Sequence, residues 1–195
     1  KGVGAGWRCR SALPPGETVH ENPWFVVRDR GGYYTTEPRE PQLVVLPIVE
    51  GERVVLIRAI RPVIDDATLE LPAGGFHPER ESGPQGAARE LAEETGIVIG
   101  DWSRFQPLPS LSVSPNRCPD RIQVYRIDLT GEEFAGRGAH DHEVVEVLCL
   151  SWGELLERIV DGRMYVTMPI AVILRHGVQS GTLTLPEARR SGGAA

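Results

Sequence analysis

The chain has 195 residues, 41% of them hydrophobic, which suits one domain with a small extension and is enough to bury a core without disulfide bonds. Its formal net charge is −6 at pH 7, and it has no basic run of the kind that binds nucleic acid or an anionic membrane surface. If the substrate carries phosphate, cations must therefore mediate between that substrate and this acidic protein.

The cysteines and the apolar runs indicate a cytoplasmic protein. Cys9, Cys118 and Cys149 are widely spaced and form no C-x-x-C pair, which argues against a disulfide framework or a zinc site and favours a reducing compartment. The apolar runs at residues 43–49 and 54–57 have the length of strands, far below the roughly 20 residues of a membrane span. No signal peptide is visible.

Strand signals dominate the first part of the chain. Residues 17–29 contain the run Trp24-Phe25-Val26-Val27, residues 30–32 are typical of a turn, and residues 33–36 return as a hairpin partner. Two prolines within residues 37–41 exclude a central strand there and indicate a linker. We therefore expect residues 1–42 to form a small N-terminal β segment, with a mobile end at residues 1–6.

The next part of the chain combines two strands and one well-delimited helix. Strands are expected at residues 43–49 and 53–60, joined by a turn at residues 50–52. Ser82 followed by Gln85 has the pattern of a capping box, and Gly96 is placed to end the helix that begins there.

The remaining elements complete an α/β pattern. Strands are expected at residues 123–129 and 143–150, and helices at residues 153–160 and 168–175. This order predicts an α/β domain over residues 43–178, with a mixed sheet that carries helices on its faces. Residues 179–195 are expected to be a C-terminal tail.

The expected helix carries an unusual concentration of carboxylates. Glu90, Glu93 and Glu94 stand at positions i, i+3 and i+4, where like charges repel each other by about 0.2–0.5 kcal/mol per pair. One interpretation is a solvated face with surplus charge. The other is a site for a divalent cation, because Mg²⁺ takes hard oxygen ligands from a few carboxylates and completes its shell with water and phosphate. The Gly-rich loop before the helix and Arg89 within it favour the cation.

The spacing around these glutamates matches a known pattern: Gly75, five residues, Glu81, seven residues, Arg89-Glu90-Leu91, one residue, Glu93-Glu94, one residue, Gly96-Ile97. It resembles the Nudix box, G-x5-E-x7-R-E-U-x-E-E-x-G-U with U aliphatic, at every fixed position. The resemblance implies a Nudix α/β/α sandwich and Mg²⁺-dependent hydrolysis, with Mn²⁺ as a second ion, of a nucleoside diphosphate linked to another group. It also implies metal binding by Glu90, Glu93 and Glu94, while Glu81 pairs with Arg89 or assists a metal-bound water.

The segments that flank the box point to a subfamily. "LELPAGG" at residues 69–75 is similar to the E-L-P-A-G segment of ADP-ribose and nucleoside-diphosphate-sugar pyrophosphatases, and "SPNRCPDRI" at residues 114–122 resembles their S-P-G-x-S-D/E-E-R-I loop. The resemblance covers roughly residues 43–178. It implies a set of substrate-binding residues: Arg58, Arg61, Glu70, Pro115 and Arg121.

The sequence departs from the subfamily in two places. One extra residue lies between Glu70 and Glu81, so the backbone carbonyl that binds metal in relatives is assigned to Gly74, with Ala73 as the alternative. Asn116 and Asp120 replace the usual Gly and Glu of the substrate loop. These changes weaken the assignment to ADP-ribose itself and leave GDP-mannose or another sugar nucleotide open.

An acidic loop precedes the last expected strand. By resemblance it supplies a carboxylate that helps to bind metal or activates water, and Glu143 is the closest match, with Asp141 and Glu146 as alternatives within the loop. Because the catalytic base varies among Nudix enzymes, Glu93 of the box is its rival.

We therefore predict a Mg²⁺-dependent pyrophosphohydrolase that cleaves ADP-ribose or a similar nucleotide sugar into a nucleoside monophosphate and a sugar phosphate. The alternatives are a Nudix hydrolase of an oxidised nucleotide, coenzyme A or a dinucleoside polyphosphate, and a non-catalytic Nudix-fold binding module. Trp24, Tyr33 and Tyr34 are candidates for stacking on a base or for packing. By resemblance, the N-terminal strands form a dimerisation sheet, so the expected assembly is a homodimer.

Overall fold

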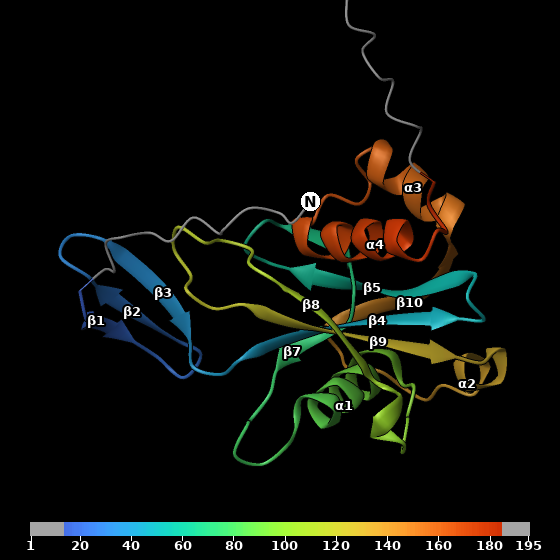
Figure 1. Ribbon diagram of the computed structural model, residues 1–195, viewed down its shortest axis with the longest axis horizontal. Coiled ribbons are helices and arrows are strands. Elements are labelled where there is room, and N and C mark those ends of the chain that lie inside the picture. Colours follow the sequence, from blue (N-terminus) through green and yellow to red (C-terminus); the bar gives the residue numbers. More distant parts are fainter. Residues whose placement is uncertain (1–13, 185–195) are drawn as a thin grey trace, which may run out of the picture.

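Two β-sheets form the frame of the protein (Figure 1). The computed structural model describes residues 14–184; Cys9, the expected mobile end at residues 1–6 and residues 185–195 of the expected tail lie outside this range. The smaller sheet is antiparallel, has the order β1-β2-β3, and lies at the left of Figure 1. Its strands are β1 (Glu17–Glu21), β2 (Phe25–Asp29) and β3 (Tyr34–Pro38).

The larger sheet has seven strands and is mixed. Its order is β10-β5-β4-β9-β8, with β6 paired to β5 and β7 paired to β4; the β4–β9 pair is parallel and the others are antiparallel. The strands are β4 (Gln42–Val49), β5 (Arg53–Arg61), β6 (Asp66–Glu70), β7 (Ala73–Gly75), β8 (Gln106–Leu111), β9 (Ile122–Leu129) and β10 (Val144–Ser151).

The middle of this sheet positions the segment just before the box. β4 and β5 pair only next to their turn, at Ile48–Val54 and Val49–Arg53. Further along, β5 pairs with β6 and β4 pairs with β7 instead. The link between β6 and β7 is fixed because the Pro72 carbonyl accepts a hydrogen bond of 2.8 Å from the Val45 N–H. Residues 70–75 therefore lie at the centre of the sheet.

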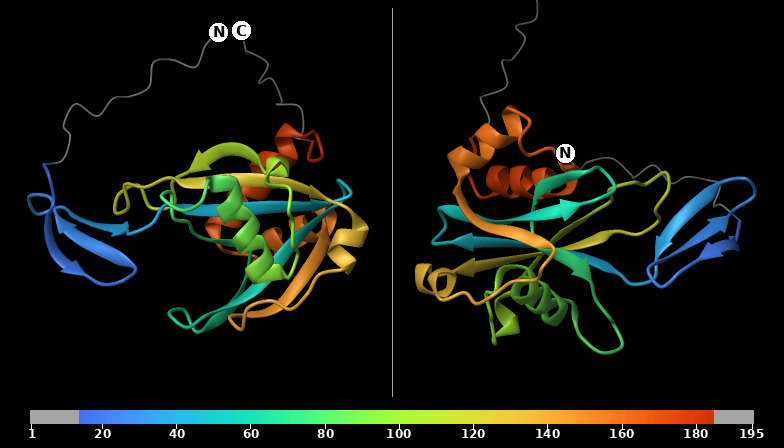
Figure 2. Two further views of the ribbon diagram at one scale, coloured as in Figure 1. Left: turned by 90° about the horizontal axis from the view of Figure 1, so that it is seen from below. Right: turned by 180° about the vertical axis from the view of Figure 1, so that it is seen from behind.

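Helices cover both faces of the larger sheet (Figures 1 and 2). α1 (Gly83–Thr95) lies on one face, and α3 (Trp152–Val160) and α4 (Thr167–Gln179) lie on the other. A short α2 (Gly131–Ala135) follows β9, and a 3-10 turn spans Trp102–Arg104. The predicted α/β/α Nudix-type sandwich with a small N-terminal β segment is confirmed. Within residues 14–184, no helix is both long enough and apolar enough to span a membrane.

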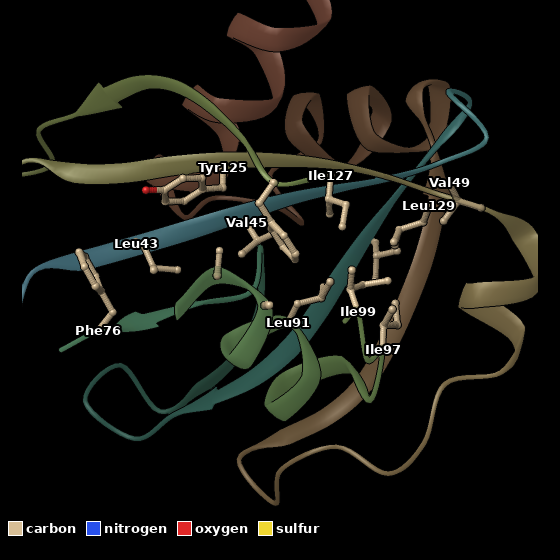
Figure 3. Close-up of a cluster of buried hydrophobic side chains, with 14 residues drawn as sticks. Leu43, Val45, Val49, Phe76, Leu91, Ile97, Ile99, Tyr125, Ile127 and Leu129 are labelled. Carbon is tan, nitrogen blue, oxygen red and sulfur yellow. The ribbon is translucent and has the colours of Figure 1, made fainter. Parts of the chain in front are cut away.

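The core is divided between the two faces of the sheet. Figure 3 shows the cluster on the α1 side, where Leu43 and Val45 of β4 are buried together with Leu91 of α1 and Ile127 of β9. The cluster on the other side joins the alternate residues of the same strands to α3 and α4. β4 is buried on both faces and reads as a nearly continuous apolar run, as expected for a central strand.

Several elements differ from the sequence-based expectation. The run at residues 17–29 is two strands, because the Asn22 side chain accepts the N–H groups of Trp24 and Phe25 at 2.9 Å and turns the chain. The expected linker at residues 37–41 is shorter, because Glu37 and Pro38 belong to β3. Pro38 is tolerated because it is the last residue of β3, which is an edge strand. The sequence analysis missed β6, β7 and β8.

The predicted ends of α1 are confirmed. The Ser82 N–H donates to Oε1 of Gln85 at 2.8 Å, and Gly96 has φ of 73° and donates its N–H to the Ala92 carbonyl at 2.9 Å. A Cβ at Gly96 would lie 2.3 Å from the carbonyl oxygen of Gly138. Gly96 is therefore required both for its left-handed backbone and for a close backbone approach.

Gly96→Ala is expected to destabilise the protein more than Gly51→Ala does. Gly51 has the same φ of 73° with nothing within 4 Å of its Cβ position, so its replacement costs only the left-handed strain, about 1–2 kcal/mol. At Gly96 the clash with Gly138 adds about 1–3 kcal/mol. Urea unfolding of both variants measures the difference. Equal losses would mean that the segment around Gly138 moves away without cost.

Candidate active site

The acidic helix α1 lies against the backbone of β7. An ideal Cβ built on Gly74 would lie 2.3–2.4 Å from the carboxylate atoms of Glu90, so no side chain fits there. β7 is in turn fixed by its pairing with β4, in which Gly74 lies opposite Leu43. Because Gly74 has no side chain, the Glu90 carboxylate of α1 can lie against the main chain of β7.

Arg89 binds most of the box carboxylates. Its Nη2 donates to Oε1 of Glu81 at 2.9 Å and to the carbonyl of Gly75 at 2.7 Å. Its Nη1 donates to Oε1 of Glu90 at 2.8 Å and to Oε2 of Glu93 at 3.0 Å. The hydrogen bond to Glu81 and the other carboxylates raise the pKa of Arg89, and the same bond lowers the pKa of Glu81. Of the two roles considered for Glu81, the pairing with Arg89 is therefore present.

Glu90 and Glu94 are withdrawn from solvent, whereas Glu93 is exposed. Glu90 is only 7% exposed, and burial raises its pKa. Glu94 is half-buried and accepts the Ala73 N–H at 2.9 Å; burial raises the pKa of Glu94 to about 8. The alternative of a solvated acidic face is therefore wrong for these two residues.

The chemistry of these donors fits a divalent cation. A carboxylate that is held away from water needs a proton or a positive partner, and Mg²⁺ prefers such hard oxygen ligands. Across residues 14–184, no three Asp, Glu, His or Cys side chains are arranged around one metal position. The fit therefore depends on Glu90 and Glu94 together with a backbone carbonyl of Ala73 or Gly74, since Mg²⁺ needs few protein ligands. Metal binding by Glu93 remains a prediction, because this carboxylate contacts Arg89.

We call the carboxylates of Glu90 and Glu94 the acidic centre. A cavity of about 690 Å³ lies beside it and is lined by two of the predicted residues, Arg61 and Glu143. Glu70 also lines it, and Arg61 donates through Nε and Nη2 to the two carboxylate oxygens of Glu70, at 2.7 and 3.0 Å. The hydrogen bond with Glu70, and the charges of Glu94 and Glu143, raise the pKa of Arg61. The structure thus brings Glu143, from a distant part of the sequence, close to the box.

The loop that carries Glu143 is attached to α1. The Gly138 N–H donates to the Gly96 carbonyl at 2.8 Å, and the Asp141 N–H donates to the Glu93 carbonyl at 2.7 Å. The Glu143 carbonyl accepts the Ile60 N–H at 3.1 Å, which joins the loop to β5. These bonds place the candidate base relative to the acidic helix.

The two alternatives in this loop have other partners. The Asp141 carboxylate accepts the His142 N–H at 2.5 Å and contacts the His142 ring, and this hydrogen bonding lowers the pKa of Asp141. Glu146 pairs with Arg58 at 3.3 Å. Arg58 stands three positions from Arg61 on β5, so the two side chains lie on opposite faces of the strand. The structure therefore does not bring Arg58 to the acidic centre.

Pro115 lies in the loop between β8 and β9, which contacts the smaller sheet, and Arg121 is exposed just before β9. In this loop the Arg117 carbonyl accepts the Thr36 N–H at 2.8 Å, and its guanidinium lies 5.2 Å from the centre of the Tyr33 ring. The Tyr33 hydroxyl donates to the Asn116 carbonyl at 2.5 Å. Neither Pro115 nor Arg121 lines the cavity that contains Arg61 and Glu143.

A second cavity, of about 620 Å³, lies between the N-terminal sheet and this loop. It is lined by Trp24, which is 75% exposed, by Arg39 and Arg117, and by Gly75 at the start of the box. The sequence analysis did not single out Arg39 or Arg117. Arg39 belongs to no motif, and Arg117 stands at the unspecified position of the loop at residues 114–122. Both reach the cavity only through the packing of two distant segments.

Comparison with known proteins finds a matching family and similar relatives. The pattern of the NUDIX domain matches residues 38–168. An ADP-ribose pyrophosphatase of Mycobacterium tuberculosis is 27% identical over 177 residues, which cover 85% of this chain and 83% of that protein. An ADP-sugar pyrophosphatase of Mus musculus is 31% identical over 121 residues, covering 59% of this chain and 55% of that protein. The fold is similar to a crystal structure of an ADP compounds hydrolase, with a TM-score of 0.61 and 18% identity over 86% of this chain and 93% of that one.

Proposed function

The chain belongs to the Nudix family, and from that premise we propose that it is a Mg²⁺-dependent pyrophosphohydrolase of ADP-ribose or a similar nucleotide sugar. The observation that carries the proposal is the pair of carboxylates against the backbone of residues 73–74, buried Glu90 and half-buried Glu94, with Arg61 and Glu143 at the adjoining cavity. This arrangement brings together oxygen ligands for a metal ion, the guanidinium of Arg61 for a phosphate, and the carboxylate of Glu143 as a base.

The residues divide the work of hydrolysis among them. Glu90, Glu94 and the carbonyl of Ala73 or Gly74 would hold the ion, which when bound neutralises phosphate oxygens and favours deprotonation of water. Arg89 fixes Glu81, Glu90 and Glu93 in place. Glu143, with Glu93 as its rival, accepts the proton of the attacking water.

The reaction breaks one bond of the diphosphate bridge. The water oxygen attacks one phosphorus, the bridging P–O bond breaks, and a nucleoside monophosphate and a sugar phosphate separate. Arg61 binds a phosphate oxygen of the diphosphate and holds it equally in the substrate and in the transition state.

The two cavities support a nucleotide sugar as the substrate. Such a molecule has a planar base on one side of its diphosphate and a polar sugar on the other. The cavity of about 620 Å³ offers the exposed ring of Trp24 for stacking and reaches Gly75 of the box. The cavity of about 690 Å³ holds Arg61 and Glu143. The names of the relatives from Mycobacterium tuberculosis and mouse support the same class.

A substrate panel tests the proposal directly. We expect ADP-ribose or another nucleotide sugar, incubated with Mg²⁺, to yield a nucleoside monophosphate and a sugar phosphate on chromatography. Faster cleavage of an oxidised nucleotide, coenzyme A or a dinucleoside polyphosphate would assign another Nudix substrate. Binding without cleavage of any compound would indicate a non-catalytic module, against which the intact box argues. Light scattering would measure whether the protein is the predicted homodimer.

Excess EDTA is expected to abolish the activity, and added Mg²⁺ or Mn²⁺ to restore it. The reason is that buried Glu90 and half-buried Glu94 hold carboxylates away from solvent, and a divalent cation gives these carboxylates and the phosphate oxygens a shared positive partner. The initial rate of product formation is measured before chelation, in EDTA, and after metal is returned. Full activity in EDTA would contradict the metal requirement.

A further inference from the structure

The ion pair between Arg61 and Glu70 has a third member, which the box and its flanks do not contain. Thr68 donates its hydroxyl to Oε1 of Glu70 at 2.5 Å. Thr68 is 2% exposed and Glu70 is 7% exposed, so this hydrogen bond lies inside the protein. Arg61, by contrast, is 39% exposed through its side chain and lines the cavity of about 690 Å³. A buried hydroxyl thus supports, through one carboxylate, a cation at the cavity.

The Thr68 hydroxyl is buried, and its hydrogen-bond partner there is the Glu70 carboxylate. Thr68 and Glu70 share one face of β6, while Leu69 between them joins the core on the opposite face. Valine has the same shape as threonine and is favoured in buried strands. A buried hydroxyl is costly unless it is hydrogen-bonded. The hydrogen bond to Glu70 offsets the cost of burying this hydroxyl.

The hydrogen bond between Thr68 and Glu70 affects the orientation of Arg61. Within residues 14–184, the side-chain hydrogen bonds of Arg61 go to Glu70 through Nε and Nη2, which leaves the N–H groups of Nη1 for another acceptor. A planar guanidinium held by one carboxylate is well suited to bind a phosphate oxygen with its remaining edge. Its orientation is only as fixed as that of Glu70, whose carboxylate is the shared partner of Thr68 and Arg61.

We propose that Thr68 is a positioning residue: by fixing the Glu70 carboxylate, it holds the Arg61 guanidinium at the cavity wall in the orientation that receives a phosphate oxygen of the substrate. The identity of that phosphate rests on the proposed function. The positioning of Arg61 by Thr68 is independent of the proposed function.

The chain contains a matched control for this network. In the N-terminal sheet, Thr35 is 5% exposed and donates to Oε1 of Glu37 at 2.8 Å, and Arg30 donates to the same oxygen at 2.6 Å. The pattern is again threonine, one residue, glutamate, here with two arginines, Arg30 and Arg28, on the carboxylate. This second network lies in the smaller sheet, apart from Arg61 and Glu143.

Thr68→Val is expected to raise KM for the nucleotide sugar about tenfold, the size that the loss of one well-placed hydrogen bond produces, with kcat changed little. Thr68→Ser keeps the hydroxyl and is expected to restore KM. Thr35→Val is expected to lower the melting temperature while leaving KM and kcat at the wild-type values. Thr68→Ala takes the place of the valine variant if that variant does not fold.

A double-mutant cycle separates positioning from general damage. In an Arg61→Ala background, Thr68→Val is expected to have no further effect on KM, because the two residues act as one unit. The proposal is overturned if Thr68→Val lowers only the melting temperature, as Thr35→Val does. It is equally overturned if the effect of Thr68→Val on KM is the same with and without Arg61.

A measurement without catalysis keeps this inference distinct from the proposed function. In ¹⁵N-labelled protein, the Nε–Hε resonance of Arg61 is expected to be sharp and protected, to shift when inorganic pyrophosphate is added with Mg²⁺, and to broaden or vanish in Thr68→Val. If the wild type cleaves no compound of the panel, the proposed function fails and this resonance still decides the role of Thr68. An unchanged resonance in Thr68→Val would show that Thr68 does not position Arg61.

Discussion

Replacing Glu94 with glutamine is expected to lower kcat by about two orders of magnitude or more, and to leave the melting temperature unchanged or higher. Burial raises the pKa of Glu94 to about 8, so its negative charge opposes folding in the absence of a cation. Glutamine keeps the shape and can still accept the Ala73 N–H, while it removes the repulsion from Glu90. Only the ability to hold the ion is lost.

A matched variant and two measurements make this prediction sharp. Glu157→Gln makes the same change at an exposed position of α3 and is expected to keep the wild-type rate. Steady-state kinetics with saturating Mg²⁺ gives kcat, and thermal unfolding in EDTA gives the melting temperature. A fall in kcat of less than about tenfold would mean that Glu94 is not a principal ligand.

Glu143→Gln is expected to lower kcat by about 10²–10⁴-fold, the usual contribution of a general base, with KM nearly unchanged. Glu143 lines the cavity that holds Arg61, and its carbonyl bond to the Ile60 N–H keeps the backbone in place whatever the side chain is. The substitution therefore removes the proton acceptor and leaves the surrounding structure intact. Single-turnover rates with Mg²⁺ present would measure the chemical step directly.

The neighbouring carboxylates serve as controls for Glu143. Asp141→Asn and Glu146→Gln are expected to stay near the wild-type rate, because Asp141 is bonded to His142 and Glu146 is paired with Arg58. If Glu143→Gln is active and one of these variants is crippled, the base has been assigned to the wrong residue of the loop. If all three variants are active, Glu93 becomes the leading candidate.

Local signals made the box helix predictable. Ser82, Gln85 and Gly96 act within a few residues of themselves, and the helix begins and ends where they indicate. The strands that were missed depend on distant partners. β7 has only three residues, two of them glycines, and exists because β4 offers it a partner. β8 contains two prolines and is possible because it lies at the edge of the sheet.

The composition of the site was largely visible in the sequence, but its electrostatics were not. Glu90, Glu93 and Glu94 look equivalent as letters, yet one is buried, one exposed and one half-buried. The difference arises because the backbone of Gly74 lies against Glu90 and the Ala73 N–H bonds Glu94, and both contacts come from β7. Period-two alternation along β5 would have separated Arg58 from Arg61, had the strand been known to continue regularly to Arg61.

The attachment of the Glu143 loop to α1 has a consequence for protein engineering. The N–H groups of Gly138 and Asp141 donate hydrogen bonds to carbonyls at the end of α1. The position of Glu143 is therefore fixed by the helix and does not depend on how long the chain before Gly138 is. An insertion between α2 and Gly138 lengthens the chain before these two hydrogen bonds and leaves the Glu143 carboxylate in place. An insertion between Asp141 and Glu143 displaces it. A transplant of the acidic helix into another scaffold therefore has to include residues 138–143 as part of the same module.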